Sequence, residues 1–117
     1  MGDKIKVYQK PTCSKCRETI GILKSRDAEF ETINYYERPL SAAELRRLIK
    51  KLGVSPRDLL RKGEQVYRDL ELAKRQLSDD QLIEIMIEHP DLIQRPIVVR
   101  GTKAVLGRPP QNVDELF

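Results

Sequence analysis

Hydrophobic and polar residues follow two different periods in the first third of the chain. Residues 4–8 alternate between polar and apolar, which predicts a short strand that ends at Pro11. Residues 30–36 are rich in β-branched and aromatic side chains and predict a second strand. Between them, residues 13–26 have a helical period, with one face made of Cys13, Cys16, Ile20 and Leu23. This order predicts a βαβ unit, and the brief connection before the second strand favours parallel pairing.

The middle of the chain is predicted to be helical because three serine-led start signals precede apolar residues at helical spacing. A capping box begins the first helix, which spans residues 41–53 and stops at a glycine. A Ser-Pro pair begins the second helix, over residues 55–63, since proline is tolerated in a first helical turn. Another capping box begins the third helix, over residues 78–89.

The period returns to that of strands toward the end of the sequence. Residues 97–99 and 104–106 are apolar and are separated by a turn that contains glycine, so they predict a β-hairpin. Asn112 is predicted to cap a last short helical turn. Together with the βαβ unit, these elements predict one α/β domain over residues 1–117, with a helical insertion at about 41–94.

Composition narrows the classes of protein that fit this pattern. The 117 residues include two cysteines and one histidine, too few for a disulfide framework or a four-ligand zinc site, so no metal is expected. No apolar stretch approaches the roughly 20 residues of a membrane span, and the first residues lack a signal-peptide core. We therefore expect a cytoplasmic protein. The net charge of +4 is spread along the chain and aromatic residues make up 5%, so direct nucleic-acid binding is not expected.

The strongest chemical signal is the pair Cys13 and Cys16, which follows a predicted strand and begins a predicted helix. The positive end of a helix dipole and its unpaired N–H groups favour a thiolate at this place. A second thiol three residues later lies within disulfide range on a helix. The pair therefore predicts a redox site in which Cys13 attacks and Cys16 resolves. The structural alternative is that both cysteines are small buried residues.

Three Arg-Pro pairs form a second signal, at Arg38, Arg95 and Arg108. A residue before proline is pushed toward extended backbone, so these guanidinium groups are expected at the ends of elements. An oxyanion-binding cluster is one interpretation. Chance is the other, because the chain contains 12 arginines.

Longer matches of sequence connect the chain to a known family. They run in order through Tyr8, Pro11-x-Cys13, Leu59-Leu60-Arg61-Lys62, Asp79-Asp80-Gln81-Leu82-Ile83, His89-Pro90, Arg95-Pro96-Ile97-Val98-Val99 and Arg108-Pro109. On these residues the chain resembles the glutathione/glutaredoxin-type arsenate reductase (ArsC) family, which also contains the Spx-like regulators. The resemblance implies a thioredoxin-like fold with a helical insertion.

The resemblance also implies a role for particular residues. Cys13 matches the nucleophile, and Pro96 matches a cis-proline beside it. Arg61, Arg95 and Arg108 match the arginines that hold arsenate and lower the pKa of the thiol, so the resemblance selects Arg61 where the Arg-Pro pattern selects Arg38. It further implies no tightly bound cofactor, with glutathione, glutaredoxin or thioredoxin as the electron donor.

One position departs from the family pattern and leaves alternatives open. The family commonly reads Asn-Pro-x-Cys-Gly-x-Ser-Arg, whereas this chain has Cys16 in place of the serine. A second thiol permits an internal disulfide that thioredoxin or glutaredoxin would recycle. The same pattern occurs in Spx-like proteins, which bind RNA polymerase and generally lack a match to Arg108. A redox regulator that binds the polymerase α-subunit and a general thiol-disulfide oxidoreductase are therefore alternatives to an arsenate reductase.

Overall fold

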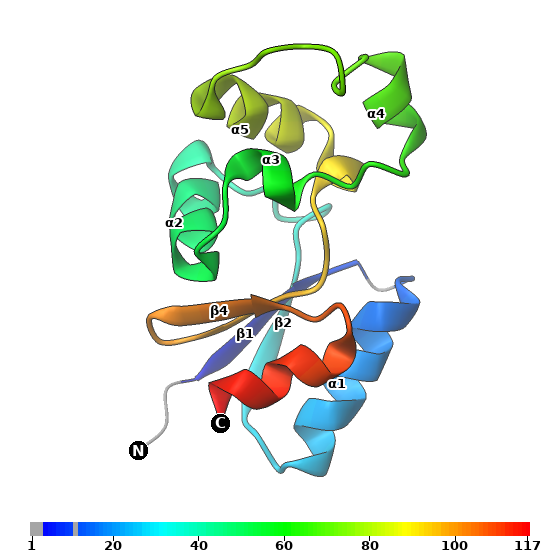
Figure 1. Ribbon diagram of the computed structural model, residues 1–117. Helices are drawn as coiled ribbons and strands as arrows, with labels where there is room; N and C mark the ends of the chain where they lie inside the picture. Colours follow the sequence, from blue (N-terminus) through cyan, green and yellow to red (C-terminus); the bar gives the residue numbers. More distant parts are fainter. Residues whose placement is uncertain (1–3, 11) are drawn as a thin grey trace. The chain divides into compact units, whose positions relative to one another are not determined.

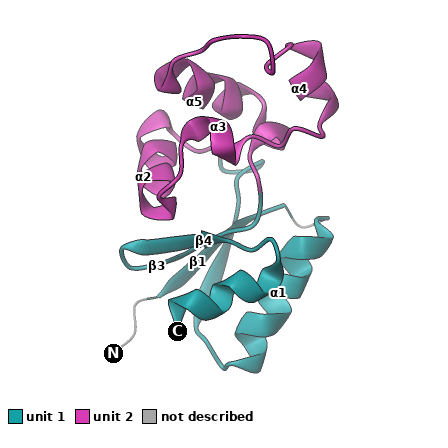
Figure 2. Ribbon diagram, in the orientation of Figure 1, with its two compact units in different colours: residues 1–38, 95–117 teal, residues 39–94 magenta. Residues whose placement is uncertain are grey.

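A computed structural model describes residues 4–10 and 12–117 of the chain (Figure 1). Pro11, where the first strand was expected to end, lies outside the described residues. The chain divides into two compact units, one made of residues 1–38 and 95–117 and the other of residues 39–94 (Figure 2). The second unit corresponds to the segment that the sequence marks as a helical insertion.

The first unit contains a four-stranded sheet in the order β2-β1-β3-β4. Strand β1 pairs in parallel with β2, and α1 connects them, which confirms the predicted βαβ unit. Strands β3 and β4 form the predicted antiparallel hairpin, and β3 also pairs antiparallel with β1. The elements of this unit are β1 (Ile5–Gln9), α1 (Ser14–Ser25), β2 (Phe30–Asn34), β3 (Ile97–Arg100), β4 (Lys103–Leu106) and the 3₁₀ helix η2 (Pro110–Leu116).

The core of this unit is formed where α1 and η2 pack against each other and against the sheet (Figure 1). Its buried residues are contributed by two strands and both helices: Ile5, Val7, Leu23, Val98, Val113 and Leu116. Burying aliphatic side chains of this size contributes roughly 1.5–3 kcal/mol each, so this cluster stabilises the packing of both helices on the sheet.

Strand directions bring four chain segments to one edge of the sheet. The parallel strands β1 and β2 both end there, with Tyr8 opposite Ile33. Because β3 runs antiparallel to β1, its first residue, Ile97, lies opposite Tyr8, and Leu106 at the end of β4 lies opposite Ile97. The residues that follow β1, β2 and β4, and those that precede β3, therefore meet at this edge.

Two predicted boundaries in the first unit are wrong for local reasons. Strand β2 ends at Asn34, two residues early, because its backbone carbonyl accepts hydrogen bonds from the N–H groups of Glu37 and Arg38. The Asn34 side chain also accepts one from the Tyr36 N–H at 3.0 Å, an asparagine-led turn. Asn112 does not cap η2: it lies within that helix, which Pro109 precedes.

The second unit is helical, as predicted, with elements α2 (Ala42–Leu52), α3 (Pro56–Leu59), α4 (Gln65–Asp69), α5 (Asp79–Glu88) and the 3₁₀ helix η1 (Pro90–Leu92). The capping boxes at Ser41 and Ser78 are both formed, and Gly53 ends α2 with φ of 72°, a conformation that favours glycine. Helix α3 ends at Leu59, earlier than predicted, and α4 was not predicted.

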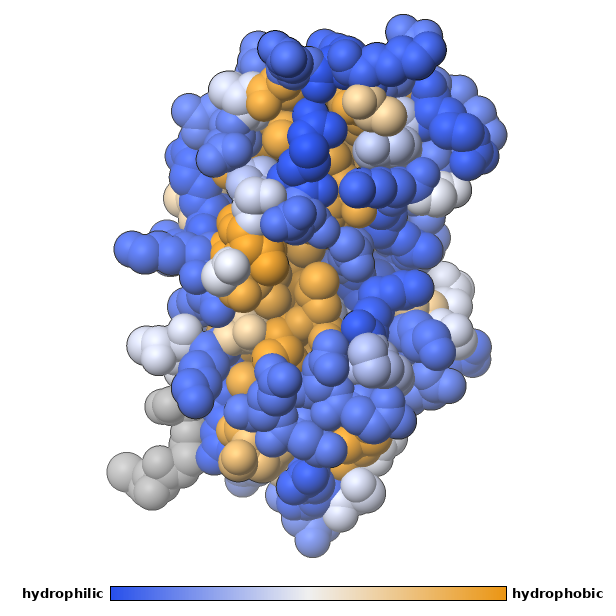
Figure 3. Space-filling view, viewed as in Figure 1, coloured by the Kyte–Doolittle hydropathy of each residue, from blue (hydrophilic) through white to orange (hydrophobic). Residues whose placement is uncertain are grey.

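The surface of each unit is largely hydrophilic on the face that Figure 3 shows, consistent with a charged fraction of 34%. Within residues 4–10 and 12–117, no helix is long and apolar enough to cross a membrane.

Candidate active site around Cys13

Cys13 occupies the N-cap position of α1, four residues after β1 ends at the shared sheet edge. Its backbone is extended, and its Sγ accepts a hydrogen bond from the Cys16 N–H at 3.4 Å. A side chain at this position satisfies one of the free N–H groups at a helix start, a contact that is stronger when the acceptor is charged. The chain geometry therefore favours a thiolate at Cys13, and its side chain is partly exposed.

The electrostatic surroundings of Cys13 act in the same direction. Partial burial alone would raise the pKa of its thiol. Hydrogen bonds from the Cys16 side chain and backbone, together with attraction to the Arg95 guanidinium, outweigh that effect and lower the pKa of Cys13 below the ordinary cysteine value. The lowered pKa increases the thiolate fraction of Cys13, and the thiolate is the nucleophilic form of cysteine.

Cys16 has the opposite character. It is completely buried, and burial together with its hydrogen bond to Cys13 raises its pKa to about 12. Both cysteines are free thiols in the structure. The pair thus combines an accessible sulfur that ionises easily with a buried sulfur, one turn farther along the helix, that holds its proton.

This difference predicts selective alkylation. At neutral pH, iodoacetamide is expected to modify Cys13 and to leave Cys16 unmodified, because the thiolate is the reacting form. The pH of half-maximal rate should lie below that of a free cysteine measured under the same conditions, because the pKa of Cys13 is lowered. Mass spectrometry of the digested protein measures the extent of modification at each cysteine, and a pH series gives the pH dependence of the rate at Cys13. Equal modification of the two cysteines would contradict this account of the site.

Arg95 is the buried cation of the site. It precedes β3 at the shared edge and is only 7% exposed, and its Nε and Nη1 atoms are buried without a hydrogen-bond partner. Burial alone would lower the pKa of this guanidinium, but attraction to and hydrogen bonding with Tyr35 raise it. A buried charge with unsatisfied donors is costly, so these two nitrogens are well suited to an anion.

Arg108 lies close to Arg95, because it follows β4 at the same edge. Its Nη1 donates a hydrogen bond to the Arg95 carbonyl oxygen at 3.4 Å. The turn that carries Arg108 is held by Asn112, whose Nδ2 donates to the carbonyls of Leu106 and Arg108. The peptide bond before Pro96 is cis, as the resemblance implies, and so is the bond before Pro109. The first unit therefore brings together Cys13, Cys16, Arg95, Pro96 and Arg108.

Arg61 belongs to the second unit, where it follows α3. Its Nε pairs with Glu64 at 3.4 Å, and its backbone N–H donates to the Leu92 carbonyl. A role for Arg61 at Cys13 therefore stays a prediction of the resemblance. Arg38, which the Arg-Pro pattern selected, is exposed on the turn after β2.

Tyr35 and Tyr36 were not identified as site residues from the sequence. Tyr35 is 2% exposed and stacks on Tyr36, with ring centroids 5.1 Å apart. The Lys10 ammonium lies over the Tyr36 ring, 4.9 Å from its centroid. Their position directly after the second predicted strand could have identified them, because the residues that follow β1 and β2 lie at the same edge of the sheet as Cys13.

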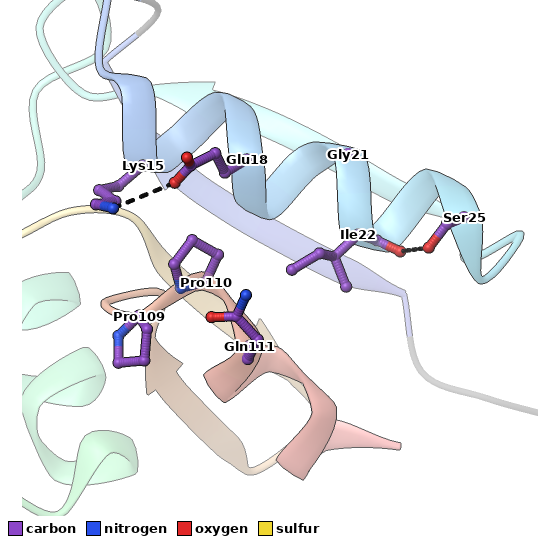
Figure 4. A pocket seen from close by; sticks show the side chains of 8 residues that line it. All are labelled: Lys15, Glu18, Gly21, Ile22, Ser25, Pro109, Pro110 and Gln111. Carbon is purple, nitrogen blue, oxygen red and sulfur yellow. Dashed lines mark hydrogen bonds and ion pairs between the residues drawn. The ribbon is translucent and has the colours of Figure 1, made fainter.

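A separate groove of about 460 Å³ runs between α1 and η2 (Figure 4). Lys15 and Glu18 form an ion pair at 3.4 Å along it, and Pro109, Pro110 and Gln111 lie opposite. Cys13 and Arg95 are not among its lining residues, so this groove is distinct from the candidate site. Among the described residues, no three side chains of the kinds that bind metals gather in one place.

Sequence comparison places these residues in a family context. Residues 8–116 match the model of the ArsC family. The chain is 46% identical to the uncharacterised protein YfgD of Escherichia coli strain K12, over 99% of this chain and 98% of that protein. It is 40% identical to an arsenate reductase of the same strain, over 97% of this chain and 80% of the relative.

Comparison with solved structures agrees with these sequence matches. The arsenate reductase from Vibrio cholerae superposes with a TM-score of 0.94 at 42% identity, and the match covers 100% of both chains. This similarity confirms the expected thioredoxin-like α/β fold. The chain belongs to the ArsC family.

Proposed function

We propose that this protein is a thiol-dependent arsenate reductase. The observation that carries the proposal is the placement of a partly exposed cysteine with a lowered pKa, Cys13, beside a buried arginine, Arg95, that has two unpartnered nitrogens. A nucleophilic thiolate and a fixed cation suit attack on a small oxyanion, because the cation neutralises charge that the attack adds. Two of the relatives described above are named as arsenate reductases.

The first step joins sulfur to arsenic. The Cys13 thiolate attacks the arsenic of arsenate, an S–As bond forms, and one arsenic-bound oxygen leaves as water after taking up protons. Arg95 and Arg108 hold the remaining oxygens. For Arg61, the same role is implied by the resemblance to the ArsC family alone. No electron has moved from sulfur at this stage, so arsenic is still As(V).

The second step transfers two electrons. A second thiol, from Cys16 or glutathione, gives up its proton and attacks the Cys13 sulfur. A disulfide forms, and the electron pair of the S–As bond goes to arsenic, which leaves as arsenite. Cys16 is well placed for the internal route, since it already hydrogen-bonds the Cys13 sulfur. Thioredoxin or glutaredoxin then reduces the disulfide, and no bound cofactor is needed.

Mass spectrometry after addition of arsenate tests the proposal. The reduced wild type should release arsenite and form a Cys13–Cys16 disulfide, whereas Cys16→Ser should need glutathione and form a mixed disulfide at Cys13. Samples without arsenate are the control. The proposal fails if no arsenite is released with glutathione and glutaredoxin or with thioredoxin, or if the disulfide forms equally without arsenate.

A general thiol-disulfide oxidoreductase is the second candidate, favoured by the contrast between an ionisable Cys13 and a buried Cys16. Reduction of insulin disulfides without arsenate turnover would favour it. Regulation through RNA polymerase rests on the resemblance alone, and this chain retains Arg108, for which Spx-like proteins generally lack a match.

A further inference from the structure

The side chain of Tyr35 hydrogen-bonds the guanidinium of Arg95, the buried cation of the site. Tyr35 lies one residue after β2, at the sheet edge that also carries Cys13 and Arg95. We infer that Tyr35 is a positioning residue that holds the Arg95 guanidinium in place for an oxyanion such as arsenate. The inference rests on the function proposed above and adds a residue to it.

The tyrosine is itself held firmly. Its ring is buried and stacks on Tyr36 at an interplanar angle of 30°. Tyr36 is fixed in turn, because its N–H donates to the Asn34 side chain and its ring lies under the Lys10 ammonium. The Tyr35 hydroxyl therefore has a defined position relative to the end of β2, and a group fixed in this way can fix its hydrogen-bond partner.

The chemistry of a tyrosine suits this task better than that of a carboxylate. Buried arginines usually pair with Asp or Glu, which would cancel their charge. A neutral hydroxyl oxygen accepts one hydrogen bond from the guanidinium and leaves its positive charge intact. Nε and Nη1 of Arg95 stay buried without a partner, and their desolvation cost is relieved when an anion accepts from them. Tyr35 thus orients the cation without neutralising it.

Tyr35→Phe removes the hydroxyl and keeps the ring. It therefore tests the hydrogen bond to Arg95 while the stacking on Tyr36 is retained. The pH profile of Cys13 alkylation should move to higher pH, since Arg95 no longer sits where it stabilises the thiolate. The arsenate concentration that gives half-protection of Cys13 from alkylation should rise about tenfold, typical of losing a hydrogen bond to a charged group. Both measurements are made in a Cys16→Ser background without glutathione, because no disulfide can then form at Cys13 and protection by arsenate reports binding.

Two further variants make the test specific. Tyr67→Phe removes the hydroxyl of another buried tyrosine, in the second unit, and should leave both measurements as in the wild type. In an Arg95→Gln background, Tyr35→Phe should change neither measurement, because the residue through which it acts is gone. Thermal unfolding of each variant checks that it folds.

The inference is overturned if Tyr35→Phe matches the wild type in both measurements, or if it has the same effect with and without Arg95. A wild type that releases no arsenite would refute the proposed function instead. In that case the alkylation profile still reports whether Tyr35 acts on Cys13 through Arg95, so the two failures can be told apart.

Discussion

Replacing Cys13 with serine is expected to slow arsenate reduction by about 10³-fold or more, the scale of loss when a nucleophile is removed. A serine hydroxyl stays protonated where the Cys13 thiol ionises, and the hydrogen bonds and the Arg95 charge that lower the thiol pKa cannot bridge that difference. The measurement is arsenite release with glutathione and glutaredoxin, and in parallel with thioredoxin.

Cys13→Ser should remove the nucleophile without destabilising the fold. Serine is a preferred N-cap residue, so its hydroxyl can accept the Cys16 N–H hydrogen bond that Cys13 now accepts, and α1 should keep its stability. Cys16→Ser is the matched comparison, and it should retain much more activity when glutathione is supplied. Turnover by Cys13→Ser within tenfold of the wild type would exclude Cys13 as the nucleophile.

The second large effect is expected at Gly107, which joins β4 to the Arg108 turn. Its N–H donates to the Pro96 carbonyl at 2.9 Å, and a Cβ at this position would lie 2.6 Å from Thr19 Oγ1 and 2.7 Å from Pro96 Cγ. Thr19 is completely buried on α1, so neither neighbour can move without displacing the backbone that carries the site. Gly107→Ala should cost about 1–3 kcal/mol of unfolding free energy and lower the activity.

Gly21 provides the matched control in the same unit. It lies within α1, and beyond the adjacent residues and the backbone of its own helix nothing lies within 4 Å of an added Cβ. Gly21→Ala should therefore stabilise the protein by about 0.5–1 kcal/mol, because alanine loses less backbone entropy in a helix. Urea unfolding measures both variants. If Gly107→Ala is as stable as the wild type, the close packing of the turn against Thr19 and Pro96 is not a constraint.

Helix boundaries show which local signals could be read in advance. The helices that begin at Ser41 and Ser78 were predicted because their capping boxes lie within four consecutive residues. Helix α4 was missed because it has five residues and its N-cap, Glu64, makes no side-chain hydrogen bond. Helix α3 ends early because Leu60 leaves it to pair with Ile93, a contact between residues far apart in the sequence.

The residues of the candidate site also differ in whether a local sequence pattern could identify them. Cys13 and Cys16 could be assigned from the residues alone, because one helix start sets both their spacing and their unequal exposure. Arg95 and Arg108 were suggested by a local Arg-Pro pattern, but that pattern selected the exposed Arg38 equally well. Arg61 was named only through the resemblance to a family, since nothing in the neighbouring sequence distinguishes it from the other arginines of the chain.

The sequence by itself determined the βαβ unit, the helix starts and the reactive cysteine pair, because each depends on residues within a few positions of one another. Only the tertiary structure decided which cation faces Cys13 and which tyrosine holds it. Tyr35 and Arg95 are 60 positions apart in the chain, and they meet because β2 runs parallel to β1 while β3 runs antiparallel. Strand pairing sets such contacts, and no local pattern encodes them.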